Sequence, residues 1–127
     1  MYVRGEGVPQ DYTEAVRLFR KAADQGHPSG QYLLGVLYVT GNGVVQDYTE
    51  AVRWYLKAAD QGMPTAQFAL GKLLMEGKHV MQDDAAALQW LSLAHANGSK
   101  RADDYVQHLI KRMDPDEVRA VRDKMLS

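Results

Sequence analysis

A period of 36 residues dominates this sequence. Residues 5–40 align with residues 41–76 without gaps, and 22 of the 36 aligned positions are identical. The same spacing continues in a degraded third copy, where Asp83, Ala87 and Trp90 follow Asp, Ala and Trp of the second copy. A repeat of this length is one supersecondary unit that buries its apolar face against its neighbours. We therefore expect a repeat protein.

Each copy has the pattern of two helices joined by a short turn. Apolar residues at helical spacing follow Asp47, which can cap the helix N-terminus while Glu50 completes a capping box. Gly62 can take the left-handed conformation just past the end of this helix. The second helix is expected from about Pro64, which is tolerated in a first turn, to Gly77. The sequence contains no strand pattern.

Small residues mark the places where helices are expected to cross. They are Gly35 and Gly71 in one helix of the pair, and Ala22, Ala23, Ala58 and Ala59 in the other. Because side chains of this size let two backbones approach closely, stacked pairs can bury their apolar stripes against one another. The fold class predicted is all-α, a right-handed α-solenoid of antiparallel helix pairs with about six substantial helices.

The expected solenoid covers residues 1–127 as a single domain. It divides into a partial repeat at 1–26, repeats at 27–62 and 63–98, and a degenerate C-terminal repeat with its cap at 99–127. Asp114, Pro115 and Glu117 predict the start of a C-terminal capping helix that runs to about Met125.

Composition excludes several classes of function. Fifteen Lys and Arg against sixteen Asp and Glu leave a net charge of −1, so nucleic acid is not an expected partner. No apolar run long enough for membrane insertion and no signal peptide occur, although a removed export signal leaves the localisation unknown. With no Cys, the chain has neither disulfides nor thiolate metal sites.

Catalytic and metal-binding patterns are also missing from the sequence. The four histidines include no pair at i, i+4 spacing, and no serine lies in a nucleophile elbow. Asp83-Asp84 and Asp103-Asp104 are expected to cap helices or face solvent rather than to act as an acid–base pair. We therefore predict no enzyme activity, no metal and no cofactor.

The string LGVLYVTGNGVVQDYTEAVRWYLKAADQG, residues 34–62, resembles the Sel-one-like repeat, a relative of the tetratricopeptide repeat. LGxxY, GxGV, QDY, AxxWY and KAAxQG occur together and in order, and the similarity extends from Gly5 to Gly98. Gln107 stands where the other copies have glycine, and the Cys pair of some bacterial members is absent. The resemblance implies a non-catalytic protein-binding scaffold, often in bacterial envelope, host-interaction or signalling systems.

The same resemblance implies that the LGxxY helix lines a concave, peptide-binding face. Its outward positions are Tyr32, Val36, Val39, Phe68, Lys72, Met75, Arg101, Asp104, His108 and Arg112. Apolar residues at one end of this set and basic residues at the other fit a peptide with apolar anchors and some acidic residues. Two alternatives stay open: these are ordinary exposed or packing positions, or the chain is a structural spacer of a longer repeat protein without its own ligand.

The start of the chain has its own expectation. Residues 2–5 match residues 38–41 at the repeat spacing, so Met1 falls within a helical pattern. We expect a preceding helix from a longer repeat protein or from a second chain. Without it, the apolar side of the first complete helix, including Tyr12 and Phe19, is expected to promote self-association.

Overall fold

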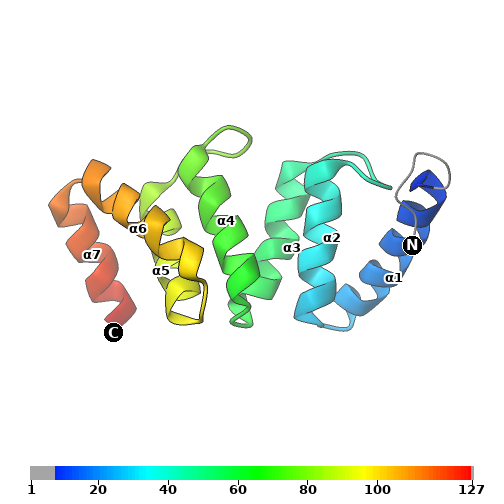
Figure 1. The fold of residues 1–127 in the computed structure, drawn as a ribbon, viewed down its shortest axis with the longest axis horizontal. Helices are drawn as coiled ribbons and strands as arrows, with labels where there is room; N and C mark the ends of the chain where they lie inside the picture. Colours follow the sequence, from blue (N-terminus) through cyan, green and yellow to red (C-terminus); the bar gives the residue numbers. More distant parts are fainter. Residues whose placement is uncertain (1–7, 127) are drawn as a thin grey trace. The chain divides into compact units, whose positions relative to one another are not determined.

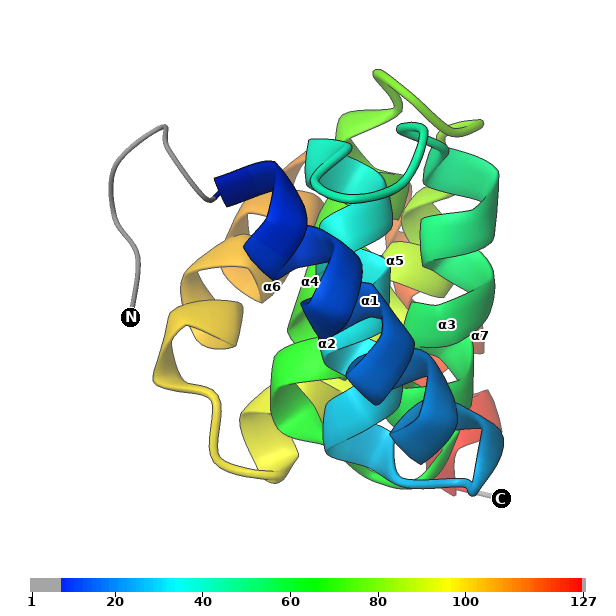
Figure 2. The ribbon, with the colours of Figure 1, turned by 90° about the vertical axis from the view of Figure 1, so that its right-hand side faces the viewer.

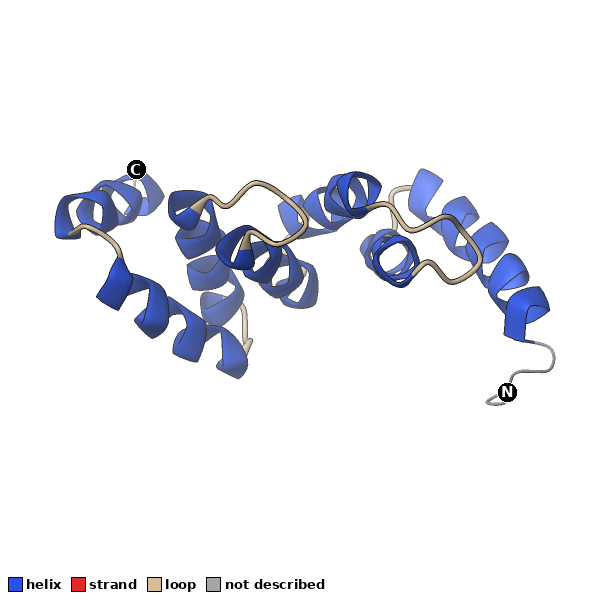
Figure 3. Ribbon diagram, turned by 90° about the horizontal axis from the view of Figure 1, so that it is seen from above, coloured by secondary structure: helices blue, strands red, loops and turns tan. Residues whose placement is uncertain are grey.

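The computed structural model describes residues 8–126, and this part of the chain consists of helices joined by turns and loops, without strands (Figures 1 and 3). The seven helices of this range are α1 (Val8–Asp24), α2 (Pro28–Thr40), α3 (Tyr48–Asp60), α4 (Pro64–Glu76), α5 (Asp84–Ala96), α6 (Lys100–Arg112) and α7 (Pro115–Leu126). The all-α prediction is confirmed, with one more substantial helix than expected. The helical stub predicted at residues 2–5 lies outside the described residues.

The helices form two compact units, which divide between Gln61 and Gly62. In the first unit α2 packs against both α1 and α3, and Figure 2 shows it from the side of α1. In the second unit α5 packs against α4, α6 and α7. Helices that are neighbours in sequence thus pack in order, which is the arrangement of a solenoid-like repeat protein.

Aspartates cap the helices at the positions the sequence predicts. Asp47 accepts a hydrogen bond from the Glu50 N–H at 3.1 Å, and Asp83 accepts one from the Ala86 N–H at 3.0 Å. The other half of the predicted capping box is replaced. The Asp47 N–H donates to the Tyr38 carbonyl, and the Glu50 carboxylate binds Arg53.

Glycines allow the closest helix contacts, as the sequence predicts. A Cβ added at Gly35 would lie 2.7 Å from the Tyr55 ring, and one at Gly71 would lie 2.6 Å from Cγ of Leu91. These two contacts are equivalent, because both partners are separated by the repeat length. The predicted alanine contact belongs to Gly30, whose added Cβ would lie 2.7 Å from Cβ of Ala22.

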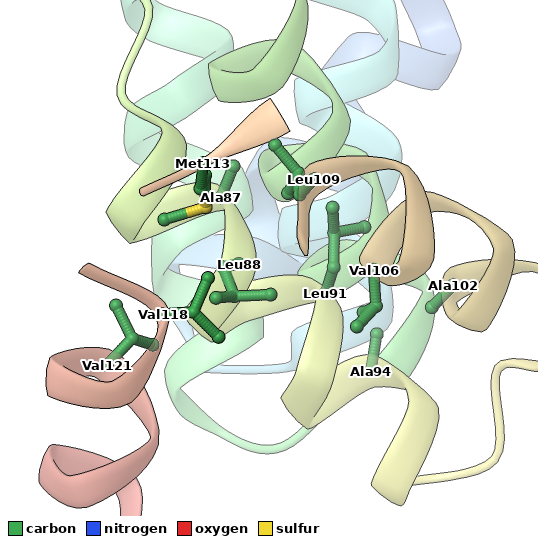
Figure 4. Close-up of a cluster of buried hydrophobic side chains, with 10 residues drawn as sticks. All are labelled: Ala87, Leu88, Leu91, Ala94, Ala102, Val106, Leu109, Met113, Val118 and Val121. Atoms are coloured by element: carbon green, nitrogen blue, oxygen red, sulfur yellow. The ribbon is translucent and has the colours of Figure 1, made fainter. Parts of the chain in front are cut away.

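The core of the second unit collects apolar side chains from three helices and one turn. Figure 4 shows them on α5 (Ala87, Leu88, Leu91, Ala94), on α6 (Ala102, Val106, Leu109), at Met113, and on α7 (Val118, Val121). Burying this set stabilises the unit through the hydrophobic effect. The predicted capping helix is therefore present, and it closes the core of the second unit.

Buried amides join successive turns within each unit. Gln61 donates to the side-chain carbonyl of Gln31 at 2.9 Å, and Asn97 donates to that of Gln67 at 3.1 Å. The two hydrogen bonds occupy equivalent repeat positions and satisfy polar groups that would otherwise be costly to bury. They fix the turns at the starts of α2 and α4, the helices that carry most of the predicted binding residues.

Charged residues on the outer face of α1 and α3 form the short-range pairs that the sequence predicts. Arg17 binds Glu14 and Arg53 binds Glu50, each three residues apart. Arg20 differs from its expected pairing with Asp24, because its guanidinium donates to the Tyr38 hydroxyl at 2.7 Å. Tyr38 thereby ties α1 to α2.

Candidate peptide-binding surface

An aromatic cluster in the second unit brings together predicted residues of α4 and α6. The Phe68 ring packs edge-on against Tyr105, with ring centroids 5.0 Å apart and planes at 84°. The Arg101 guanidinium lies 5.1 Å from the centroid of the Phe68 ring, in cation–π contact. Both rings are half-buried and pack against the core of the unit, so they offer an anchored aromatic surface.

A hollow lies on the same pair of helices. It encloses about 260 Å³ and is lined by Met75 of α4 and by Asp104, Tyr105 and His108 of α6. Three of these residues belong to the predicted set, and the helical repeat explains their grouping on α6, since positions 104 and 108 are one turn apart. Tyr105 was not predicted. The equivalent positions of the earlier copies hold Leu33 and Ala69, so the repeat pattern carries no signal for an aromatic residue there.

Arg112, predicted at the basic end of the surface, is engaged within the unit. Its guanidinium binds the Asp84 carboxylate at 2.6 Å and donates to the Met75 carbonyl at 2.8 Å. The hydrogen bonds from Arg112 lower the pKa of Asp84 below its ordinary value. Arg112 thus links the end of α6 to the end of α4 and the start of α5, beside the hollow.

The first unit carries the three predicted residues of α2. The Tyr32 ring stacks on Tyr55 of α3, with centroids 5.6 Å apart and planes at 27°. Burial raises the pKa of the Tyr55 phenol, so this ring stays neutral. Val36 and Val39 are half-buried, and the Val39 carbonyl accepts a hydrogen bond from the Gln46 amide at 2.6 Å. This surface is apolar and lies on α2.

Other chemistry finds little support in residues 8–126. This range contains no group of three His, Asp or Glu side chains placed to hold a metal ion. Of the acidic pairs considered in the sequence, Asp83 caps α5, Asp84 binds Arg112, and Asp103 accepts a hydrogen bond from Gln107. None of the helices described is both long and apolar enough to cross a membrane.

Comparison with known families identifies the repeat. The family model described as Sel1 repeat matches residues 1–27, 28–63 and 64–99. The chain belongs to the Sel1 repeat family. This confirms the resemblance seen in the sequence, and members of the family are typically non-catalytic and generally mediate protein interactions.

Two solved Sel1 repeat structures are similar to this chain. A Sel1 repeat protein from Oxalobacter formigenes matches with a TM-score of 0.75 and 34% identity, covering 79% of this chain and 41% of its own. The protein c5321, a protective antigen present in uropathogenic Escherichia coli strains that displays an SLR fold, matches with a TM-score of 0.69 and 44% identity, covering 72% and 20%. The chain therefore spans less than half the length of either protein. No curated protein matches it.

Proposed function

We propose that this Sel1 repeat chain is a non-catalytic scaffold that binds a protein or peptide on the α4/α6 surface of its second unit. The observation that supports this most directly is the Phe68–Tyr105 pair beside the hollow lined by Met75 and His108. Half-buried aromatic rings bind partners well because their positions are already fixed and little conformational entropy is lost on binding.

The chemistry of the surface defines the partner. The hollow accepts one apolar side chain against Met75 and Tyr105, while Asp104 and His108 can hydrogen-bond to the partner's backbone. Arg101 adds a positive charge at the other end of the aromatic pair. A peptide with an apolar anchor followed by an acidic residue fits this order of groups.

The spacer alternative has support of its own. The rings of Phe68 and Tyr32 both pack against aromatic neighbours of the same unit. Rings in such positions stabilise a repeat even without a ligand. A test must therefore change the surface without removing this packing.

Exposed residues allow such a test. A peptide selected on the chain from a random library would be titrated, by fluorescence anisotropy, into wild type and into an Arg101→Ser, His108→Ser variant. We expect at least tenfold weaker binding by the variant, which corresponds to about 1.4 kcal/mol. The matched control is His95→Ser, Arg119→Ser, which changes the same two residue types at exposed positions outside this surface.

Circular dichroism would first establish that both variants retain the helical content of wild type. The control should bind the peptide as wild type does. Equal affinity of all three proteins would place the binding surface elsewhere, and failure to select any peptide would favour the spacer function.

A further inference from the structure

Three helices of the chain carry equivalent faces. On α3 the face consists of Ala51, Trp54 and Tyr55, and α2 covers it, with Gly35 against the Tyr55 ring and the Ala51 carbonyl. The matching face of α5 contains Ala87 and Leu91, against which α4 places Gly71 in the same way. In both units a glycine of the preceding helix therefore meets this face.

The equivalent face of α1 contains Ala15, Leu18 and Phe19, and it is more exposed. Leu18 is 49% exposed, whereas Trp54 at the equivalent position of α3 is only 7% exposed. Ala15 is half-buried, whereas Ala51 is fully buried. The difference arises because α2 contacts α1 elsewhere, at Ala22, and no other described helix packs extensively against α1.

The two covering helices show what this face accepts. Both α2 and α4 have 13 residues, begin with proline, and carry a Leu-Gly pair near the middle. The leucines of these pairs, Leu34 and Leu70, are almost completely buried, and the glycines let the backbone approach the neighbouring helix. A helix with a larger residue in place of the glycine would clash with this kind of face.

We propose that the Ala15–Leu18–Phe19 face of α1 is a docking site for one kind of partner, a Leu-Gly helix of the α2 and α4 type supplied by another Sel1 repeat. The glycine would lie over Ala15 and Phe19, as Gly35 lies over Ala51 and Tyr55. Leu18 would then be covered as Trp54 is. This interaction does not depend on the α4/α6 surface, so either proposal can fail while the other stands.

A peptide in solution tests this site on the intact chain. The probe is a peptide of residues 64–76, and its matched control is the same peptide with Gly71→Leu. Each would be titrated into the ¹⁵N-labelled chain, up to about 1 mM because an isolated helix of this length is only marginally formed. We expect saturable shifts at the Ala15, Leu18 and Phe19 amides, with at least tenfold weaker binding of the leucine peptide.

A variant of the chain gives a second, independent measurement. Ala15→Leu fills the place where the glycine would approach, so it should weaken binding of the glycine peptide at least tenfold while the helical circular dichroism signal is retained. Equal binding of the two peptides, shifts confined to other helices, or no shift at the highest concentration would overturn the proposal. So would α1 shifts that depend on protein concentration without peptide, because a second copy would then occupy this face.

Discussion

Two consecutive helix pairs of the second unit pack in different ways. In the α4/α5 pair, Gly71 lets α4 approach Leu91 closely, and the two helices pack against each other over much of their length. The α6/α7 pair has Gln107 at the equivalent position, and only Met113 and Asp114 connect the helices. There α7 packs on α5, with little contact to α6.

The difference changes what the last pair does. A hollow of about 380 Å³ opens beside α6 and α7, lined by Ile110, Pro115, Val118, Arg119, Arg122 and Asp123. At the same time α7 places Val118 and Val121 in the core of the unit (Figure 4). The comparison shows that close pairing needs both a small residue at the crossing and a loop long enough to let the next helix return. Without them, the last helix acts as a cap.

The largest effect is expected from replacing the glycine of the close pair. In Gly71→Leu, the new side chain would collide with Leu91 and with the Ala87 carbonyl, 3.3 Å from the added Cβ. Overpacking of this kind should lower the free energy of unfolding by about 3 kcal/mol. Urea denaturation followed by circular dichroism measures the change.

The matched control is Gln107→Leu at the equivalent position of α6. Gln107 is exposed, so its replacement should change the free energy of unfolding by less than about 0.5 kcal/mol. Similar losses in both variants would show that the two pairs do not differ in packing as the structure indicates.

Much of this fold follows from sequence patterns that have a direct physical basis. Asp47 and Asp83 lie at helix starts because their carboxylates can satisfy free backbone N–H groups. Gly77 ends α4 in the left-handed conformation, at φ +66°. The repeat makes such local signals reliable, because each occurs twice at the same spacing.

The details of the candidate surface depend on contacts between helices that a single repeat does not encode. Tyr105 and Arg112 lie in the degraded copy, where the repeat no longer indicates the residue type. The ion pair of Arg112 with Asp84 joins residues 28 positions apart and replaces an expected free charge at the surface. Side chains of this kind are positioned by packing between copies rather than by helical spacing.

A smaller effect is expected at this ion pair, which holds α6 beside the close pair. Arg112→Ala removes the contacts with Asp84 and with the Met75 carbonyl, and it should cost about 1 kcal/mol at pH 7, because the groups are partly exposed. Arg112 keeps the folded-state pKa of Asp84 below its unfolded value. The pair therefore stabilises the fold above the unfolded pKa of about 3.9 and loses this effect as the pH falls through the folded pKa.

Urea denaturation of wild type and Arg112→Ala at pH 7 and at pH 3 would show this dependence, with a smaller difference at the lower pH. Arg119→Ala is the matched control, since its pair with Asp116 is largely exposed and should contribute almost nothing. A difference that stays the same at both pH values would assign the role of Arg112 to its contact with the Met75 carbonyl.

The smallest effect is expected when the glycine is restored to the last pair. In Gln107→Gly, the side chain that occupies the crossing position is removed, but the short connection at Met113 and Asp114 remains. Since that connection holds α7 on α5, the helices should not close, and only the lower helix propensity of glycine should act. We expect a loss of about 0.6 kcal/mol in the free energy of unfolding. Gln107→Ala, which keeps a high helix propensity, should be nearly neutral, so the difference between the two variants isolates the effect of glycine. If Gln107→Gly instead raised the stability, the glutamine side chain alone would be what keeps α6 and α7 apart.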